Sequence, residues 1–148
     1  MDRQQYYMQV AEITAMRGTC RIGVGAVAVK DKRIIATAYN GAPSGMAECS
    51  KVGCHLINDH CQRAIHAEQN LIALAAKNGF SLFGCDVYVT HEPCANCMKL
   101  MIAAEIERIY FKTEYKDDRT LSEYYERIKV YKYAESDWGD YGYFRFRR

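Results

Sequence analysis

Proline is almost absent from this sequence, with two residues in 148. Together with only ten glycines, this scarcity excludes collagen-like and proline-rich linker proteins. An excess of charge of one sign is also lacking, because 20 Lys and Arg residues against 18 Asp and Glu residues give a formal net charge of +2. We therefore do not expect a nucleic-acid partner, which would need a basic surface.

Long apolar runs are missing as well. No run approaches the roughly 20 residues of a membrane span. The first ten residues, MDRQQYYMQV, lack the apolar core of a signal peptide. These absences predict a cytoplasmic protein without a membrane partner.

Cysteine is the residue type that stands out, with seven in the chain. The rest of the composition, 49% hydrophobic and 26% charged, is that of an ordinary globular protein. A length of 148 residues predicts a single domain over residues 1–148. In a reducing compartment, so many cysteines indicate metal ligands rather than disulfides.

Hydrophobic periodicity predicts an alternation of helices and strands. Helices are expected over 2–18, 64–78, from Pro93 onward and over 120–129, and strands over 23–30, 33–39, 86–90, 107–112 and 130–133. The crossovers between strands imply an α/β fold with three layers, α/β/α, in which a mixed central sheet of about five strands carries helices on both faces.

Two segments do not follow this pattern. Residues 40–62 have no clean period, and a loop of that length inside a compact domain needs something to hold it. Residues 134–148 form an aromatic and basic tail, most clearly from Trp138 to Arg148. We expect this tail to be a docking segment or a frayed end.

Two short motifs carry chemistry, His66-Ala67-Glu68 and Pro93-Cys94-Ala95-Asn96-Cys97. Alone, the second could be a structural zinc or redox motif, and the first is uninformative. Together, each at an expected helix start, they form the signature of zinc-dependent nucleobase deaminases. His66, Cys94 and Cys97 would leave a fourth zinc position open for water, and Glu68 would accept a proton from that water.

Five segments carry a wider resemblance. They are RGTC at 17–20, VGAVAVKDKRIIATAYNGAPSG at 24–45, DHCQRAIHAEQN at 59–70, VYVTHEPCANC at 87–97 and IYFKTEY at 109–115. From Gly18 to Tyr115 the chain resembles the cytidine deaminase superfamily and, within it, the deoxycytidylate (dCMP) deaminases. The resemblance implies hydrolytic deamination of dCMP to dUMP and ammonia, which supplies dUMP for dTMP synthesis.

The resemblance also implies roles for individual residues. Glu68 would activate the water that attacks C4 of cytosine. The Ala67 backbone N–H would hold the pyrimidine O2, and the backbone from Thr90 to Glu92 would accept a hydrogen bond from N4.

The residues that would contact the sugar and the phosphate have alternative interpretations. Asn40 matches an asparagine that binds the sugar hydroxyl, although Asn-Gly is also a turn signal. Tyr115 matches a nucleotide-contacting tyrosine, although it could be one more surface residue among 12 tyrosines. Arg21, Lys116 and Arg119 are candidates for the phosphate.

A second zinc site is expected from the cysteines that remain. Cys20, Cys49, Cys54 and Cys61 could hold a closed structural zinc that orders the long loop, with His60 as the main substitute ligand. Bacterial and phage dCMP deaminases commonly carry such a site. The alternative is a set of free thiols.

Regulation and assembly come from the resemblance alone. It implies a homohexamer that dCTP with Mg²⁺ activates and dTTP inhibits, with Gly41, Leu74 and Lys77 as candidate effector residues. The alternatives are a core leucine at 74 and a solvated lysine at 77.

Two other functions compete with dCMP deamination. The first is deamination of another cytosine substrate, such as dCTP, dCTP together with dCMP, free cytidine or single-stranded nucleic acid. The second is a zinc-stabilised binding protein without catalysis, which would have no use for Glu68.

Overall fold

A computed structural model describes residues 1–135 and 141–148. The helices are α1 (Arg3–Ala15), α2 (Cys49–Val52), α3 (Ala67–Asn78), α4 (Ala95–Ala103) and α5 (Ser122–Arg127). The strands are β1 (Gly25–Lys30), β2 (Arg33–Tyr39), β3 (Leu56–Ile57), β4 (His60–Cys61), β5 (Asp86–His91), β6 (Arg108–Thr113), β7 (Lys129–Glu135) and β8 (Tyr141–Arg145).

Six of these strands form one sheet in the order β2-β1-β5-β6-β7-β8. β1 pairs antiparallel with β2 and β5, whereas β5, β6 and β7 are parallel to one another. Parallel neighbours need a crossover connection, and α4 and α5 supply it. The expected mixed sheet is confirmed, with six strands where about five were expected.

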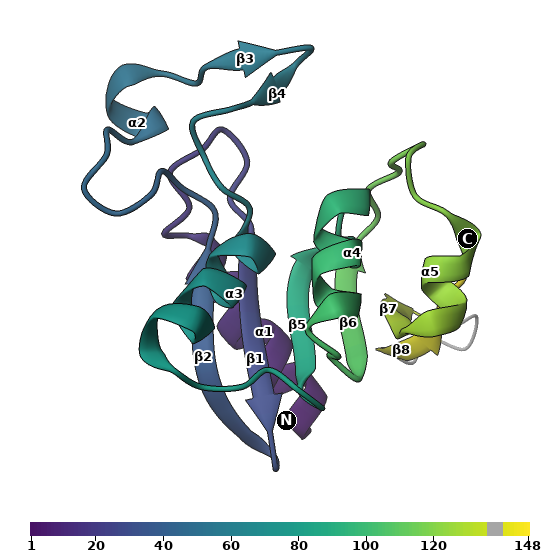
Figure 1. Cartoon of the computed structure of the whole chain (residues 1–148). Helices are drawn as coiled ribbons and strands as arrows, with labels where there is room; N and C mark the ends of the chain where they lie inside the picture. The colour runs from purple at the N-terminus through teal and green to yellow at the C-terminus, as the bar shows by residue number, and fades with distance from the viewer. Residues whose placement is uncertain (136–140) are drawn as a thin grey trace.

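Helices cover both faces of this sheet (Figure 1), with α3 and α4 in front and α1 behind. Alternate residues of β1 point to opposite faces. Ala26 and Ala28 join the core under α3, α4 and α5, whereas Val27 and Val29 pack in the cluster that contains α1. The three-layer α/β/α arrangement is therefore confirmed.

The packing of α1 depends on the glycine that begins β1. A Cβ atom on Gly25 would lie 2.0 Å from the carbonyl oxygen of Ala11 and 2.6 Å from the amide nitrogen of Ala15. Only a residue without a side chain lets the helix lie this close to the strand. This contact fixes α1 against the segment that leads into the pocket described below.

Two segments for which the sequence predicted no complete helix or strand contain short elements in the structure. The long loop contains α2, β3 and β4, which lie beyond the end of the main sheet in Figure 1. The tail contributes β8, which pairs antiparallel with β7 and is neither frayed nor irregular. Residues 136–140, which include Trp138, lie outside the described residues.

The observed helices are shorter than the ranges expected from the sequence. The first helix ends at Ala15 because the backbone tightens there: the amides of Arg17 and Gly18 bond to carbonyls three residues back. Within the described ranges, no helix has both the length and the apolar character that crossing a bilayer requires.

Candidate active site

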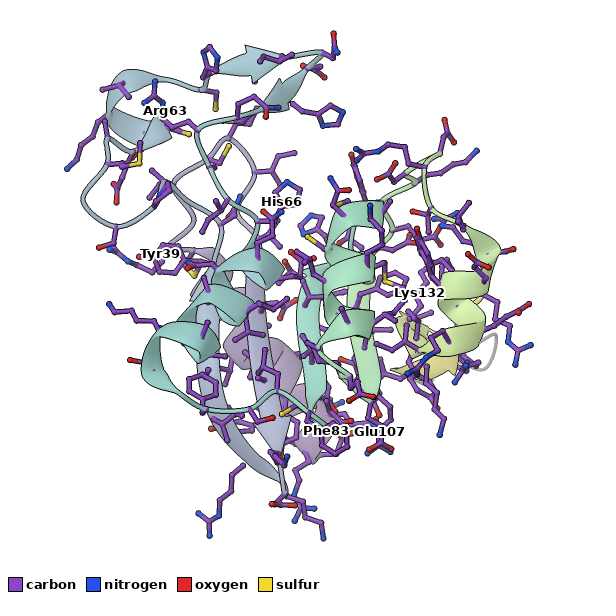
Figure 2. All side chains as sticks on the ribbon, in the orientation of Figure 1. Tyr39, Arg63, His66, Phe83, Glu107 and Lys132 are labelled. Carbon is purple, nitrogen blue, oxygen red and sulfur yellow. The ribbon has the colours of Figure 1, made fainter. Side chains whose placement is uncertain are left out.

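Three metal-ligating side chains meet where α3 and α4 begin. His66 is the N-cap of α3 and Cys94 is the N-cap of α4, while Cys97 lies in the first turn of α4. His66 Nδ1 lies 3.5 Å from Cys94 Sγ and 3.4 Å from Cys97 Sγ. Figure 2 labels His66 between the first turns of the two helices.

These distances are those of a tetrahedral zinc site. Zn–S bonds of about 2.3 Å and Zn–N bonds of about 2.0 Å place a sulfur and a nitrogen about 3.5 Å apart. The donor set of two thiolates and one imidazole also suits zinc. In the chain without metal, hydrogen bonds from Cys97 and His66 lower the pKa of Cys94, which favours the thiolate form that a metal binds.

Glu68 lies in the first turn of α3, two residues after His66, and is 4% exposed. Burial raises the pKa of its carboxyl to about 7. A carboxyl with that pKa can both accept and release a proton near neutral pH. The preceding residue, Ala67, is the first residue of the helix, so its N–H has no acceptor within the helix.

A pocket opens over this group of residues. Its walls include His66, Ala67, Glu68 and Cys94, together with Arg21, Asn40, His60, Cys61, His91, Glu92 and Tyr115. Thr90 does not line the pocket. It lies behind the wall, where its hydroxyl accepts a hydrogen bond from the Gly25 N–H at 3.2 Å and bonds to His91 Nδ1 at 3.0 Å.

Asn40 lies in the pocket wall, and its side chain already has two backbone partners. Its Oδ1 accepts from the Val24 N–H at 2.7 Å, and its Nδ2 donates to the Ile22 carbonyl at 2.6 Å. One N–H of the amide group is left for another acceptor. The following residue, Gly41, bridges to Ile65.

The wall that contains Tyr115 is held by two carboxylates. Glu92, which follows β5, accepts the Tyr115 N–H at 3.2 Å. Asp117 Oδ2 accepts the Ala95 N–H at 2.9 Å and so caps the first turn of α4. Asp117 also pairs with Arg119 at 2.8 Å. The sequence analysis missed the role of Asp117, because a cap supplied from 22 residues away leaves no local signal.

The four remaining loop cysteines form a second group. The Sγ atoms of Cys20, Cys49, Cys54 and Cys61 lie within 4.8 Å of one another. Two pairs of sulfurs are 3.6 Å apart, too far for a disulfide and close to the separation of about 3.8 Å in a tetrahedral zinc–tetrathiolate site. The expected substitute His60 is not in this group and lines the pocket instead.

This second group borders the pocket. Cys20, Arg21 and Cys61 all line it, and Arg21 is held by Asp59, whose carboxylate lies 3.2 Å from the guanidinium. Lys116 and Arg119, the other phosphate candidates, do not line the pocket. Of the three phosphate candidates, Arg21 is therefore the one that borders the pocket.

The family model of the cytidine and deoxycytidylate deaminase zinc-binding region matches residues 1–113. The chain belongs to this deaminase family. It is accordingly a hydrolytic deaminase, and the two motifs that indicated this from the sequence lie where the pocket is formed.

Individual relatives of this deaminase agree with the family match. ComE operon protein 2 of Bacillus subtilis (strain 168) is 43% identical over 127 residues, which cover 85% of this chain and 67% of that protein. The deoxycytidylate deaminase of Mycobacterium phage D29 is 38% identical over 125 residues, which cover 76% of this chain and 96% of that protein. The crystal structure of dCMP deaminase from the cyanophage S-TIM5, in complex with dCMP and dUMP, is similar with a TM-score of 0.77 and 32% identity, covering 87% of this chain and 95% of that chain.

The candidate effector residues of the deaminase lie at two places, Gly41 directly behind the pocket wall and the other two on α3. Gly41 is buried at its bridge to Ile65, whereas Leu74 is half-buried and Lys77 exposed on α3. None of the three lines the pocket. Leu74 and Lys77 are connected to the active site through α3, because His66 and Glu68 lie at its beginning, whereas Gly41 is next to the pocket residue Asn40.

Proposed function

We propose that this deaminase converts dCMP to dUMP and ammonia. The observation that carries the proposal is the buried Glu68, which lines the same pocket as His66 and Cys94, two of the three residues of the metal-binding group. The similarity to the dCMP deaminases of phage D29 and cyanophage S-TIM5 supports dCMP as the substrate.

The chain's own residues account for the proton transfers. His66, Cys94 and Cys97 would hold a zinc ion, which would supply the activation of a water molecule. Glu68 accepts the proton of the attacking water at its carboxylate oxygen and returns a proton to the departing amino group. The C4–N4 bond of cytosine breaks, and a C4–O bond replaces it.

The base and sugar are held mainly by the backbone and by Asn40. The Ala67 N–H, free at the first position of α3, donates to the pyrimidine O2, and the backbone of His91 and Glu92, which line the pocket, accepts from N4. The remaining N–H of Asn40 donates to the sugar hydroxyl. Tyr115, in the pocket wall, contacts the bound nucleotide.

The phosphate binds to Arg21. The position of Arg21 in the pocket wall and its planar guanidinium support this role, because the guanidinium forms two parallel hydrogen bonds with a phosphate. Its partner Asp59 belongs to the loop that carries the four cysteines. A structural zinc held by Cys20, Cys49, Cys54 and Cys61 would then order both the loop and the phosphate site.

Regulation, assembly and location complete the proposal. The protein acts as a single domain over residues 1–148 in a cytoplasmic homohexamer, which dCTP with Mg²⁺ activates and dTTP inhibits. Gly41, Leu74 and Lys77 contact the effector, and the shared helix α3 offers a route from Leu74 and Lys77 to Glu68. The product dUMP supplies dTMP synthesis.

A panel of substrates on the zinc-loaded protein tests this proposal. Cytosine-to-uracil conversion is measured with dCMP, dCTP, deoxycytidine and a short single-stranded DNA, each with and without dCTP or dTTP plus Mg²⁺. The proposal predicts turnover of dCMP that dCTP raises and dTTP lowers. Preference for dCTP as the substrate would refute dCMP as the substrate and would leave the deamination chemistry in place. No turnover of any substrate by the zinc-loaded protein would leave a non-catalytic binding protein.

A further inference from the structure

The carboxylate of Glu92 is almost completely buried, with 1% of its side chain exposed, yet it carries a full set of donors. Arg148 contributes two of them, Nε to Oε2 and Nη2 to Oε1, both at 2.7 Å. The Tyr125 hydroxyl donates to Oε2 at 2.7 Å, and the Tyr115 N–H donates to Oε1 at 3.2 Å. The buried charge is therefore paired with an arginine in a two-point, planar arrangement.

Arg148 also reaches the residue next to Tyr115. Its Nη2 lies 3.3 Å from Oε2 of Glu114. The guanidinium thus contacts both the carboxylate that accepts the Tyr115 N–H and the residue that precedes Tyr115 in the chain. Because Tyr115 lines the pocket and Arg148 does not, Arg148 can act on a bound nucleotide only through this wall.

The balance of charge along the wall depends on the same arginine. Three carboxylates lie there, and each faces a cation: Asp117 faces Arg119, Glu114 faces Lys132, which Figure 2 labels, and Glu92 faces Arg148. Glu92 is the most buried of the three. Removing Arg148 would leave the buried charge of Glu92 uncompensated. The loop around Tyr115 would have to move to bring that charge into contact with water.

We propose that Arg148 is a positioning residue that sets the affinity for the nucleotide through Glu92 and Tyr115. The inference rests on the proposed function, because dCMP is the substrate with which it is measured. The hydrogen bonds of Arg148 go to Glu92 and Glu114, and none goes to Glu68 or to the metal-binding residues. Its effect therefore falls on substrate binding more than on the chemical step.

The test compares Arg148→Met with Arg147→Met in the full-length, zinc-loaded protein. Arg147 is the adjacent arginine and is exposed, so it controls for loss of positive charge in the tail. Arg148→Met is expected to raise KM for dCMP about tenfold, equivalent to about 1.4 kcal/mol, and to leave kcat within about twofold. Arg147→Met should keep both constants, and all samples should bind the same amount of zinc.

Arg148→Lys provides a second variant in case the methionine variant does not fold. Lysine keeps the charge but cannot form the two parallel hydrogen bonds, so KM should rise by about threefold. A purely structural role would lower the melting temperature without moving KM. Unchanged KM in Arg148→Lys, or equal KM in Arg148→Met and Arg147→Met, would overturn the inference while leaving dCMP deamination intact. Absence of dCMP turnover in the wild-type protein would overturn the proposed function, and the inference with it.

Discussion

Asp117 offers a sharp test of how the metal-binding helix is held. Its carboxylate accepts the Ala95 N–H at the first turn of α4, and 6% of its side chain is exposed. Cys94, the N-cap residue, makes no capping hydrogen bond with its own side chain. Asp117→Ala would therefore leave the beginning of α4 without its side-chain acceptor.

The expected cost follows from these contacts. Loss of a helix cap costs about 1 kcal/mol, and the charge and burial of this acceptor raise the figure to about 2 kcal/mol. The ion pair to Arg119 adds little, because the Arg119 side chain is 61% exposed and solvent screens the attraction. Asp117→Asn keeps an acceptor oxygen but removes the negative charge at the helix N-terminus, and should cost about 1 kcal/mol.

The same carboxylate gives a pH dependence with a defined sign. Hydrogen bonds from Arg119 and from the Ala95 N–H hold the pKa of Asp117 well below its usual range. A carboxyl with a lowered folded-state pKa stabilises the protein above its unfolded-state pKa of about 4, and this stabilisation is lost as the pH falls through the folded-state value. The difference between wild type and Asp117→Asn should be complete at neutral pH and shrink below about pH 4.

Urea unfolding followed by circular dichroism measures both effects, at neutral pH and at about pH 3.5. Asp118→Asn is the matched control, because the neighbouring Asp118 side chain is 89% exposed. A chelator competition on the same proteins should show weaker zinc retention in Asp117→Ala. The reasoning fails if Asp117→Ala costs less than about 0.5 kcal/mol, or if Asp118→Asn costs as much.

Three further predictions concern other parts of the molecule. Cys49→Ser should lower the zinc content, measured by mass spectrometry of the metal, from about two to about one per chain. The control Cys85→Ala, in the core, should keep both zinc ions. Equal zinc content in the two variants would contradict the four-cysteine site. Gly25→Ala should lose more than about 3 kcal/mol in urea unfolding, because its Cβ would lie 2.0 Å from a carbonyl oxygen of α1; Gly142→Ala, with open space around the added carbon, should lose less than about 1 kcal/mol. Arg21→Met should raise KM for dCMP but not for deoxycytidine, which lacks the phosphate, and parallel changes for both substrates would exclude the phosphate role.

Sequence patterns predicted those parts of the fold that depend on residues close together in the chain. The helical period after His66 and the proline before Cys94 indicated where α3 and α4 begin, within a few residues. Asp31 and Lys32 are the two residues between the expected strands 23–30 and 33–39, and both have the positive φ that the tight turn between β1 and β2 requires. These signals depend on neighbours in sequence, so a single chain displays them.

Contacts between distant segments were harder to predict. The tail becomes β8 because Tyr143 packs against Tyr110 and Phe146 packs against Phe111, and neither partner is near in sequence. The bond between Arg148 and Glu92 spans 56 residues and likewise has no local signal. The number of cysteines indicated metal ligands, but only the folded structure shows that Cys20 lies beside the three cysteines of the long loop.

The most direct test of the account compares wild type with Glu68→Gln. Both proteins are loaded with zinc, their metal content is measured, and dCMP conversion to dUMP is followed on the same samples. The account predicts equal zinc and a fall in kcat of about 10²–10⁴-fold in the variant, because the amide cannot accept or release the proton. Equal turnover by the two proteins, or no dCMP turnover by zinc-loaded wild type, would contradict it.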